Sequence, residues 1–175
     1  MSRRGAAADS SGPPAPVKRL TSRARSSAPP GVGFYGYFRN REALLTEMLD
    51  TWERAVTEEA IKRVEEGGGD ARTRLERLFA LVASSAPTTS MSIELAIREW
   101  ARRDKDLARR VRRVDNRRTA YLRSLFASFC ADDTEVEVRC LVASSLRIGN
   151  YLIPADHAGH TRAEVMEAAK KWLLG

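Results

Sequence analysis

The stretch that decides the fold runs from Arg41 to Gly69 and reads REALLTEMLDTWERAVTEEAIKRVEEGGG. Its apolar residues recur every three or four positions, which is the spacing of one face of an α-helix. They are Leu45, Leu49, Trp52, Val56, Ala60 and Val64. Asn40 is a suitable N-cap, and the glycines at 67–69 end the pattern. The sequence therefore predicts one amphipathic helix of about 26 residues, about 39 Å long at the rise of an α-helix.

The same spacing continues towards the C-terminus and predicts five further helices, with no strand alternation and no internal repeat. They are expected from Asp70 to just before Pro87, from about Ser90 onward, from about Lys105 to Phe129, over 134–153 and over 161–174. The segment 134–153 is apolar almost all round the helix, so we expect it to be buried on more than one side. The predicted fold class is all-α.

Composition and length restrict the class of protein further. The chain has 175 residues, of which 43% are apolar and 30% charged, as in a single globular domain with an appendage. No apolar run reaches the roughly 18 residues that a membrane span needs, and no signal peptide is recognisable. We therefore expect a cytoplasmic protein that does not bind membranes. Two cysteines, Cys130 and Cys140, are too few for a disulfide framework and are expected to be free thiols.

The N-terminal end carries most of the net charge. Residues 1–40 hold seven basic residues and one acidic residue, whereas the whole chain has a net charge of +7. Residues 1–32 are rich in proline, alanine and serine and poor in large apolar residues, so we expect a disordered basic tail. Such an asymmetry favours a polyanionic partner, nucleic acid before membrane, although a solvated basic tail gives the same pattern.

The segment that follows this tail, Gly33–Leu45, reads GFYGYFRNREALL. Aromatic and basic residues directly before a helix N-terminus offer hydroxyl, guanidinium and backbone N–H donors to phosphates. This segment resembles the end of the helix-turn-helix in TetR-type (TetR/AcrR) transcriptional regulators. ELAIREWARRD at Glu94–Asp104 and VRRVD at Val111–Asp115 also resemble a subgroup of that family, so the resemblance covers about residues 33–175.

The resemblance implies a DNA-binding head over residues 33–45 and a ligand-binding and dimerisation domain over 46–175. It implies a repressor that a small apolar or amphipathic effector releases from DNA. Tyr35, Tyr37 and Arg41 match family positions that contact the DNA backbone, and Gly33 and Arg39 complete the DNA-binding candidates. The family has two helices before this segment, where this chain has a proline-rich stretch, so we expect an incomplete helix-turn-helix. The alternative is a dimerisation and ligand-binding module that has lost sequence-specific DNA binding.

The expected effector site lies among large apolar side chains of the later helices. The ligand-binding candidates are Met91, Ile97, Trp100, Tyr121 and Tyr151. The same spacing suits an ordinary core, so both interpretations stay open. We expect Trp100 and Tyr121 to line a cavity and Phe79 to belong to the core.

Several other features received a simpler interpretation. Arg118 falls on the apolar side of its helix, where its stem would cover the core and its guanidinium reach water, although it could meet an acidic ligand. His157 and His160 lie in a loop with no further ligand nearby, so no metal site is predicted. No nucleophile–base pair or phosphate loop is recognisable, so neither an enzyme nor a cofactor is expected. The helices at 134–153 and 161–174 are expected to pair with a second copy as a homodimer.

Overall fold

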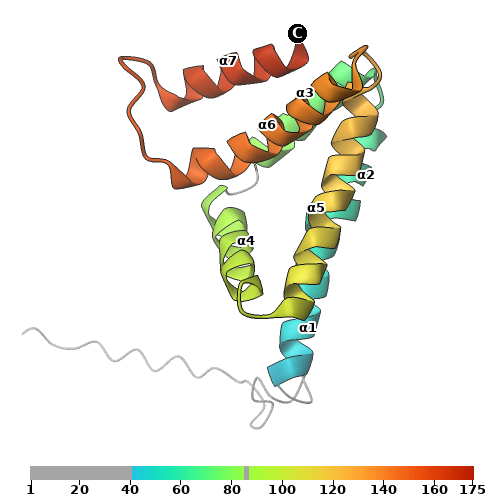
Figure 1. The fold of residues 1–175 in the computed structure, drawn as a ribbon, viewed down its shortest axis with the longest axis vertical. Coiled ribbons are helices and arrows are strands. Elements are labelled where there is room, and N and C mark those ends of the chain that lie inside the picture. The colour runs from blue at the N-terminus through green and yellow to red at the C-terminus, as the bar shows by residue number, and fades with distance from the viewer. Residues whose placement is uncertain (1–40, 85–86) are drawn as a thin grey trace, which may run out of the picture. The chain divides into compact units, whose positions relative to one another are not determined.

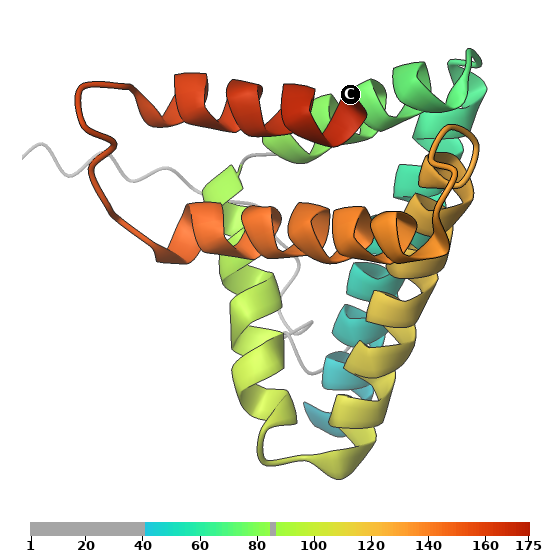
Figure 2. The same cartoon turned by 45° about the horizontal axis from the view of Figure 1, so that its top comes forward.

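The computed structural model describes residues 41–84 and 87–175, which belong to one compact unit, Asn40–Gly175. Every element named in this part is a helix, which confirms the all-α prediction (Figures 1 and 2). The elements are α1 (Arg41–Arg54), η2 (Ala55–Glu59), α2 (Ala60–Glu66), α3 (Ala71–Ser84), α4 (Pro87–Ala101), α5 (Lys105–Phe126), α6 (Asp133–Leu152) and α7 (Arg162–Leu174). In this described part, no helix offers an apolar stretch long enough to cross a bilayer.

The first predicted helix is present with its expected ends, as the continuous run α1–η2–α2. Its middle is a π-helical turn, η2, which the periodicity did not predict. The Thr57 hydroxyl donates to the Glu53 carbonyl at 2.6 Å, and Arg118 Nε of α5 donates to the Val56 carbonyl at 3.2 Å. Side-chain donors of this kind compete with the backbone ladder, and single π turns often mark functional sites.

The turn between α2 and α3 follows the predicted capping pattern. Gly68 and Gly69 have φ angles of +59° and +92°, a region that glycine adopts without steric cost. The guanidinium of Arg77 donates to the carbonyls of residues 64, 67 and 68 at 2.7–3.0 Å and so satisfies the end of α2. Asp70 Oδ1 then accepts from the Thr73 N–H at 2.9 Å, as expected of the cap that opens α3.

Two helix boundaries differ from the prediction by about three residues, the others by at most about one turn. Helix α4 begins at Pro87 rather than near Ser90, because proline is well suited to the first position of a helix. Helix α5 ends at Phe126 rather than Phe129, since the backbone N–H groups of Phe129 and Cys130 both donate to the Phe126 carbonyl and turn the chain there. The domain boundary expected between residues 45 and 46, where the DNA-binding head would end, falls inside helix α1.

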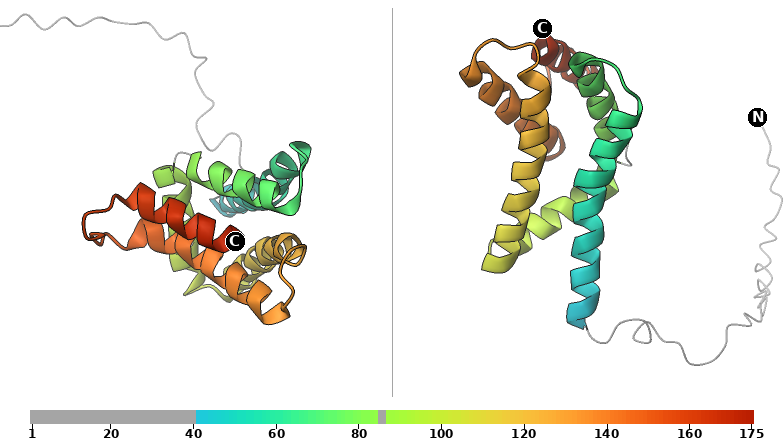
Figure 3. Two further views of the ribbon diagram at one scale, coloured as in Figure 1. Left: turned by 90° about the horizontal axis from the view of Figure 1, so that it is seen from above. Right: turned by 90° about the vertical axis from the view of Figure 1, so that its right-hand side faces the viewer.

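Most of the buried apolar side chains form two core clusters, and α5 contributes to both. The first cluster contains Leu75, Leu122, Leu125, Phe126, Val136, Cys140, Ala143, Leu173 and Leu174. The second contains Trp52, Ile97, Leu107, Val111 and Val114. Figure 3 shows α5 running alongside the α1–η2–α2 helix, and the Arg110 guanidinium on α5 pairs with Asp50 and Glu53 of α1. Helix α5 is therefore the element that joins the two clusters.

Helix α6 differs from its prediction in burial. It was expected to be buried on more than one side, but within this chain it buries only one, through Val136, Cys140 and Ala143. Leu141 on another face is 68% exposed, and Trp172 on α7 is 63% exposed. The prediction was therefore wrong for the single chain, because no described element covers this second apolar face.

Removal of a ring from the first cluster should be costly. Phe126→Ala is expected to lower the free energy of unfolding by about 3–5 kcal/mol, since Phe126 is fully buried and the ring leaves a cavity. The control Met48→Ala, at an exposed position of α1, should change it by about 0.5 kcal/mol or less. Urea unfolding measures both. Equal, small effects would contradict the described packing.

Candidate ligand cavity

A cavity of about 520 Å³ lies between five segments of the unit: η2–α2, α3, α4, α5 and α6. This volume falls in the range typical of small-molecule sites. Its apolar wall includes Val56, Ile61, Leu78, Phe79, Val82, Met91, Leu122 and Ile148. Leu122 and Ala143 belong to the first core cluster, and Val56 packs on the second. The cavity therefore lies where the two clusters meet.

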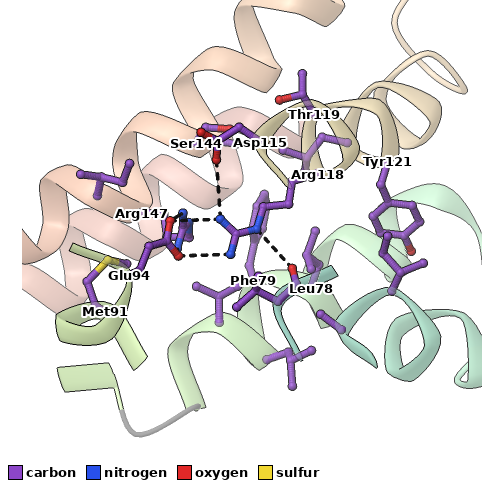
Figure 4. Close-up of a pocket in the computed structure, with 18 of the residues that line it drawn as sticks. Leu78, Phe79, Met91, Glu94, Asp115, Arg118, Thr119, Tyr121, Ser144 and Arg147 are labelled. Atoms are coloured by element: carbon purple, nitrogen blue, oxygen red, sulfur yellow. Dashed lines mark hydrogen bonds and ion pairs between the residues drawn. The ribbon is translucent and has the colours of Figure 1, made fainter. Parts of the chain in front are cut away.

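A buried carboxylate, Glu94 of α4, forms the polar end of the cavity, and its side chain is only 2% exposed. Three guanidinium groups surround it. Arg118 of α5 donates to its two oxygens at 3.0 and 3.1 Å, and Arg147 of α6 donates to them at 2.8 and 2.6 Å. Arg98, one turn along α4, donates to Oε1 at 3.1 and 2.8 Å. Figure 4 shows Arg118 and Arg147 pointing at Glu94 from their separate helices.

A second carboxylate and a backbone carbonyl complete this charged cluster. Arg98 forms a bidentate pair with Asp115 of α5, at 2.9 and 2.6 Å. Arg118 also donates to the Val56 carbonyl in the π turn. The guanidinium carbon of Arg118 lies 5.9 Å from the ring centroid of Trp52, within cation–π range. One network thus connects η2, α4, α5 and α6.

The electrostatics keep Glu94 ionised. Burial opposes the charge, but the hydrogen bonds from Arg147 and the charge and hydrogen bonds of Arg118 outweigh it, so the pKa of Glu94 is well below its ordinary value. The hydrogen bonds to Asp115 raise the pKa of Arg98 against the effect of burial. Burial lowers the pKa of Arg118, an effect that the charge of Glu94 opposes. A buried carboxylate such as Glu94 is tolerated in a protein interior because the guanidinium groups around it compensate its charge.

The cavity contains two of the five predicted ligand-binding residues, Met91 and Tyr121. The Tyr121 hydroxyl donates to Glu65 at 2.7 Å; burial first, and then this bond, raise the Tyr121 pKa. Phe79, expected in the core, packs on the first cluster and also lines the cavity.

The other three candidates lie elsewhere. Ile97 is buried in the second core cluster, and Trp100 and Tyr151 are 37% and 40% exposed and do not line the cavity. Ile97 and Trp100 miss the cavity because of the way α4 is rotated about its own axis. Its cavity face is Met91, Glu94 and Arg98, whereas the apolar stripe that contains Ile97 and Trp100 lies roughly 130° away at 100° per residue. The Tyr151 hydroxyl instead lies 2.7 Å from the Ser92 hydroxyl.

Sequence reasoning missed Glu94, Asp115 and Arg147 and placed Arg118 incorrectly. The Arg118 side chain is only 18% exposed, and its guanidinium bonds to Glu94 in the interior, which the prediction did not foresee. A usable signal was present: Arg147 stands between Leu146 and Ile148 in an apolar helix, as Arg118 does on the apolar side of α5. A lone charge in such a pattern requires a buried partner.

Most of the DNA-binding candidates lie outside the described residues. These are Gly33, Tyr35, Tyr37 and Arg39, and the predicted tail over 1–32 lies there as well. Arg41 is the first residue of α1 and is exposed.

The histidine and cysteine residues of the described part were the other candidates for chemistry. Over residues 41–84 and 87–175 no group of three histidine, cysteine or acidic side chains could hold a metal, and His157 and His160 pair through their backbones in a turn. Burial raises the pKa of the Cys140 thiol to about 11, so this thiol is protonated at neutral pH.

A scan of protein-family models and searches of curated proteins and of solved structures gave no significant match to this chain.

Replacement of the buried carboxylate should be destabilising. Glu94→Gln is expected to lower the free energy of unfolding by about 3–5 kcal/mol, because it leaves guanidinium charges in the interior without their shared counter-ion. Glu137→Gln is the control, since it removes the carboxylate of an exposed pair with Arg123 and should cost much less than Glu94→Gln, because exposed ion pairs add little stability. Chemical unfolding at pH 7 compares the two. A cost for Glu94→Gln no larger than that of the control would contradict the network.

The lowered pKa of Glu94 also predicts a pH dependence. Below its ordinary pKa of 4.5 the unfolded chain binds a proton that the native chain does not, so the native state loses stability as the pH falls. This contribution is complete above pH 4.5 and decreases below it, towards the pKa in the folded protein. Glu94→Gln should therefore show a shallower loss of unfolding free energy between pH 5 and 3 than the wild type. If the wild type and Glu94→Gln lose unfolding free energy equally between pH 5 and 3, the pKa of Glu94 is not lowered by folding.

Proposed function

We propose that residues 46–175 form the ligand-binding and dimerisation body of a TetR-type transcriptional regulator that acts in the cytoplasm, with a small apolar or amphipathic effector in the cavity. One observation carries the proposal. The cavity wall includes Val56, Glu59 and Ala60, which belong to the same continuous helix that begins at Arg41. That helix follows directly on the aromatic and basic segment that resembles the end of a helix-turn-helix. An occupied cavity can therefore act on the helix next to the DNA-binding residues.

The π turn supports such a coupling. Arg118 contacts both Glu94, at the polar end of the cavity, and the Val56 carbonyl in η2. A ligand that competes with Glu94 for the guanidinium groups around it also changes the position of Arg118, and so alters the bond from Arg118 to Val56. The equilibrium between a π turn and a regular α turn at η2 then shifts. The orientation of α1, which precedes η2 in the same helix, changes with this equilibrium. Effector binding shifts the population between two such states by its difference in affinity for them.

The second candidate function is a ligand-binding dimer without sequence-specific DNA binding. The paired prolines Pro29 and Pro30 favour it, because proline lacks the N–H donor that a helix interior needs. Selection of bound sequences from a random duplex DNA pool distinguishes the two functions. Enrichment of a palindromic motif supports the regulator, whereas sequence-independent binding, with a Kd of about 10⁻⁴–10⁻⁶ M at physiological salt, supports the second function.

Arg41→Ala should weaken DNA binding about equally on all sequences, because a phosphate contact carries no sequence information. Arg113→Ala, at an exposed position of α5, is a control that removes the same charge far along the sequence. Fluorescence anisotropy on two unrelated duplexes measures the effect. If Arg41→Ala binds like the control, Arg41 is not a DNA contact.

The exposed face of α6 is the proposed dimer interface. Its exposed stripe consists of the apolar residues Val138, Leu141 and Leu152. Their spacing of three and eleven positions places them on one side of the helix, as in helices that pack against one another. Paired with a two-fold copy, α6 and α7 would form a four-helix interface that covers Leu141 and Trp172.

Leu141→Glu should therefore convert the dimer into a monomer, since it places a charge in the centre of this interface. Leu141 is a better probe than Leu146, which packs on the first core cluster. Arg113→Glu is the matched control, because it introduces the same side chain at an exposed position outside α6 and α7. Sedimentation velocity at micromolar concentration decides between the states. A monomeric wild type would overturn the proposed interface.

A further inference from the structure

We propose that the effector cavity takes an amphipathic carboxylate, with its apolar body along α3 to α6 and its carboxylate on the guanidinium of Arg147. The inference rests on the proposed function, because it names the chemical class of the effector that the cavity admits. Three features of the cavity carry it: its charge, its shortage of hydrogen-bond acceptors and the position of its apolar wall.

The cavity has one positive charge in excess. Three arginines of the cluster, Arg98, Arg118 and Arg147, face only two carboxylates, Glu94 and Asp115. The other two charged lining residues, Arg63 and Glu59, have opposite signs and do not alter this balance. A singly charged anion neutralises the excess, and a cation increases it. A buried charge without a counter-ion is costly, so the cavity favours an anionic ligand over a neutral one.

The same cluster has too few acceptors for its donors. Six guanidinium N–H contacts converge on the two oxygens of Glu94, and four of them share Oε1. A carboxylate offers about four lone-pair sites in all. Arg98 and Arg118 each have a further acceptor, Asp115 and the Val56 carbonyl respectively.

Arg147 differs from these two arginines. Within residues 41–84 and 87–175 its only hydrogen-bond partner is Glu94, and two of its nitrogens make those bonds. A guanidinium carries five N–H donors in a planar fork. Arg147 lines the cavity, so its remaining donors are available to a ligand there. A carboxylate matches the geometry of that fork and accepts two parallel bonds.

The apolar wall begins beside this charged end. Met91 lies three residues before Glu94 on the cavity face of α4, and Leu78 and Phe79 of α3 line the same cavity as Arg118 and Arg147 (Figure 4). The wall extends along α3 to Val82, which is 41% exposed, so it reaches the surface at that helix. An apolar body placed along this wall would be removed from water while its carboxylate stays at Arg147. The site therefore distinguishes ligands by one charged group at the end of an apolar body.

A head-group series tests the proposal on the wild-type protein. Decanoate, 1-decanol and decylammonium share one chain and differ in charge; 2-naphthylacetate, 2-naphthylethanol and 2-naphthylethylammonium repeat the comparison on a rigid body. Calorimetric titration at pH 7, below any micelle concentration, gives affinity and stoichiometry. In at least one series the carboxylate should bind about tenfold tighter than the alcohol, as a charge-assisted pair predicts, and the ammonium most weakly. One molecule per chain separates cavity binding from adsorption to the exposed stripe of α6.

Arg147→Met tests the position of the carboxylate. This variant should bind the carboxylate about tenfold more weakly, close to the affinity of the alcohol, while the alcohol keeps its affinity. Arg113→Met, at an exposed position of α5, is the matched control and should behave as the wild type. Arg147→Lys keeps the charge without the planar fork, so its affinity for the carboxylate should lie between that of the wild type and that of Arg147→Met. If Arg147→Met does not fold, the wild-type series and Arg147→Lys still decide.

The outcomes separate this inference from the proposed function. If the alcohol or the ammonium binds as tightly as its carboxylate, at one molecule per chain, the preference for a carboxylate is wrong, but the cavity is still an effector site. If Arg147→Met still binds the carboxylate about tenfold tighter than the alcohol, the carboxylate does not bind to Arg147. Failure of all six compounds to bind overturns both the carboxylate and the effector cavity on which it rests.

Discussion

A carboxylate in the interior, Glu94, is the constraint on which the rest of this structure depends. Its charge is removed from water, so it must be compensated, and guanidinium groups from α4, α5 and α6 supply the compensation. Because Arg118 also donates to the Val56 carbonyl, the network around Glu94 includes the π turn of the first helix. Buried ion pairs add little net stability compared with apolar packing, but each partner that is removed leaves an uncompensated charge. We interpret the network as the element that fixes how these helices meet.

The network also explains why a cavity exists between two well-packed clusters. Apolar side chains from several helices close-pack in a core, whereas charged groups that share one carboxylate cannot approach one another without repulsion. The two clusters lie on either side, and α5 contributes Val114 to one and Leu122 to the other. The four residues of α5 that follow Val114 include Asp115 and Arg118, which line the cavity. One helix thus supplies both apolar supports and part of the polar end of the site.

The helices of this fold could be predicted from the sequence because their signals are local. Spacing of apolar residues gave the run from Arg41 to Glu66, and Asp70 was correctly identified as the cap of α3. The π turn could not be predicted, because one of its hydrogen bonds comes from Arg118, 62 residues away. The cavity was predicted in part: Met91 and Tyr121 line it, but of the expected apolar wall on α4, Ile97 belongs to the second core cluster and Trp100 is 37% exposed. Hydrophobic spacing identifies a buried face without saying which partner it meets.

The most direct test of this account is the ionisation of Glu94 itself. Carbon-13 NMR of the side-chain carboxyl groups, with Glu94 assigned by comparison with Glu94→Gln, follows each carboxylate during an acid titration. The account predicts that the Glu94 carbon keeps the chemical shift of a carboxylate as the pH falls through 4.5 and changes only when the protein unfolds, because the guanidinium groups around it lower its pKa. A Glu94 signal that titrates at or above pH 4.5 in the folded protein would contradict it, since the carboxylate would then lack the compensation described here.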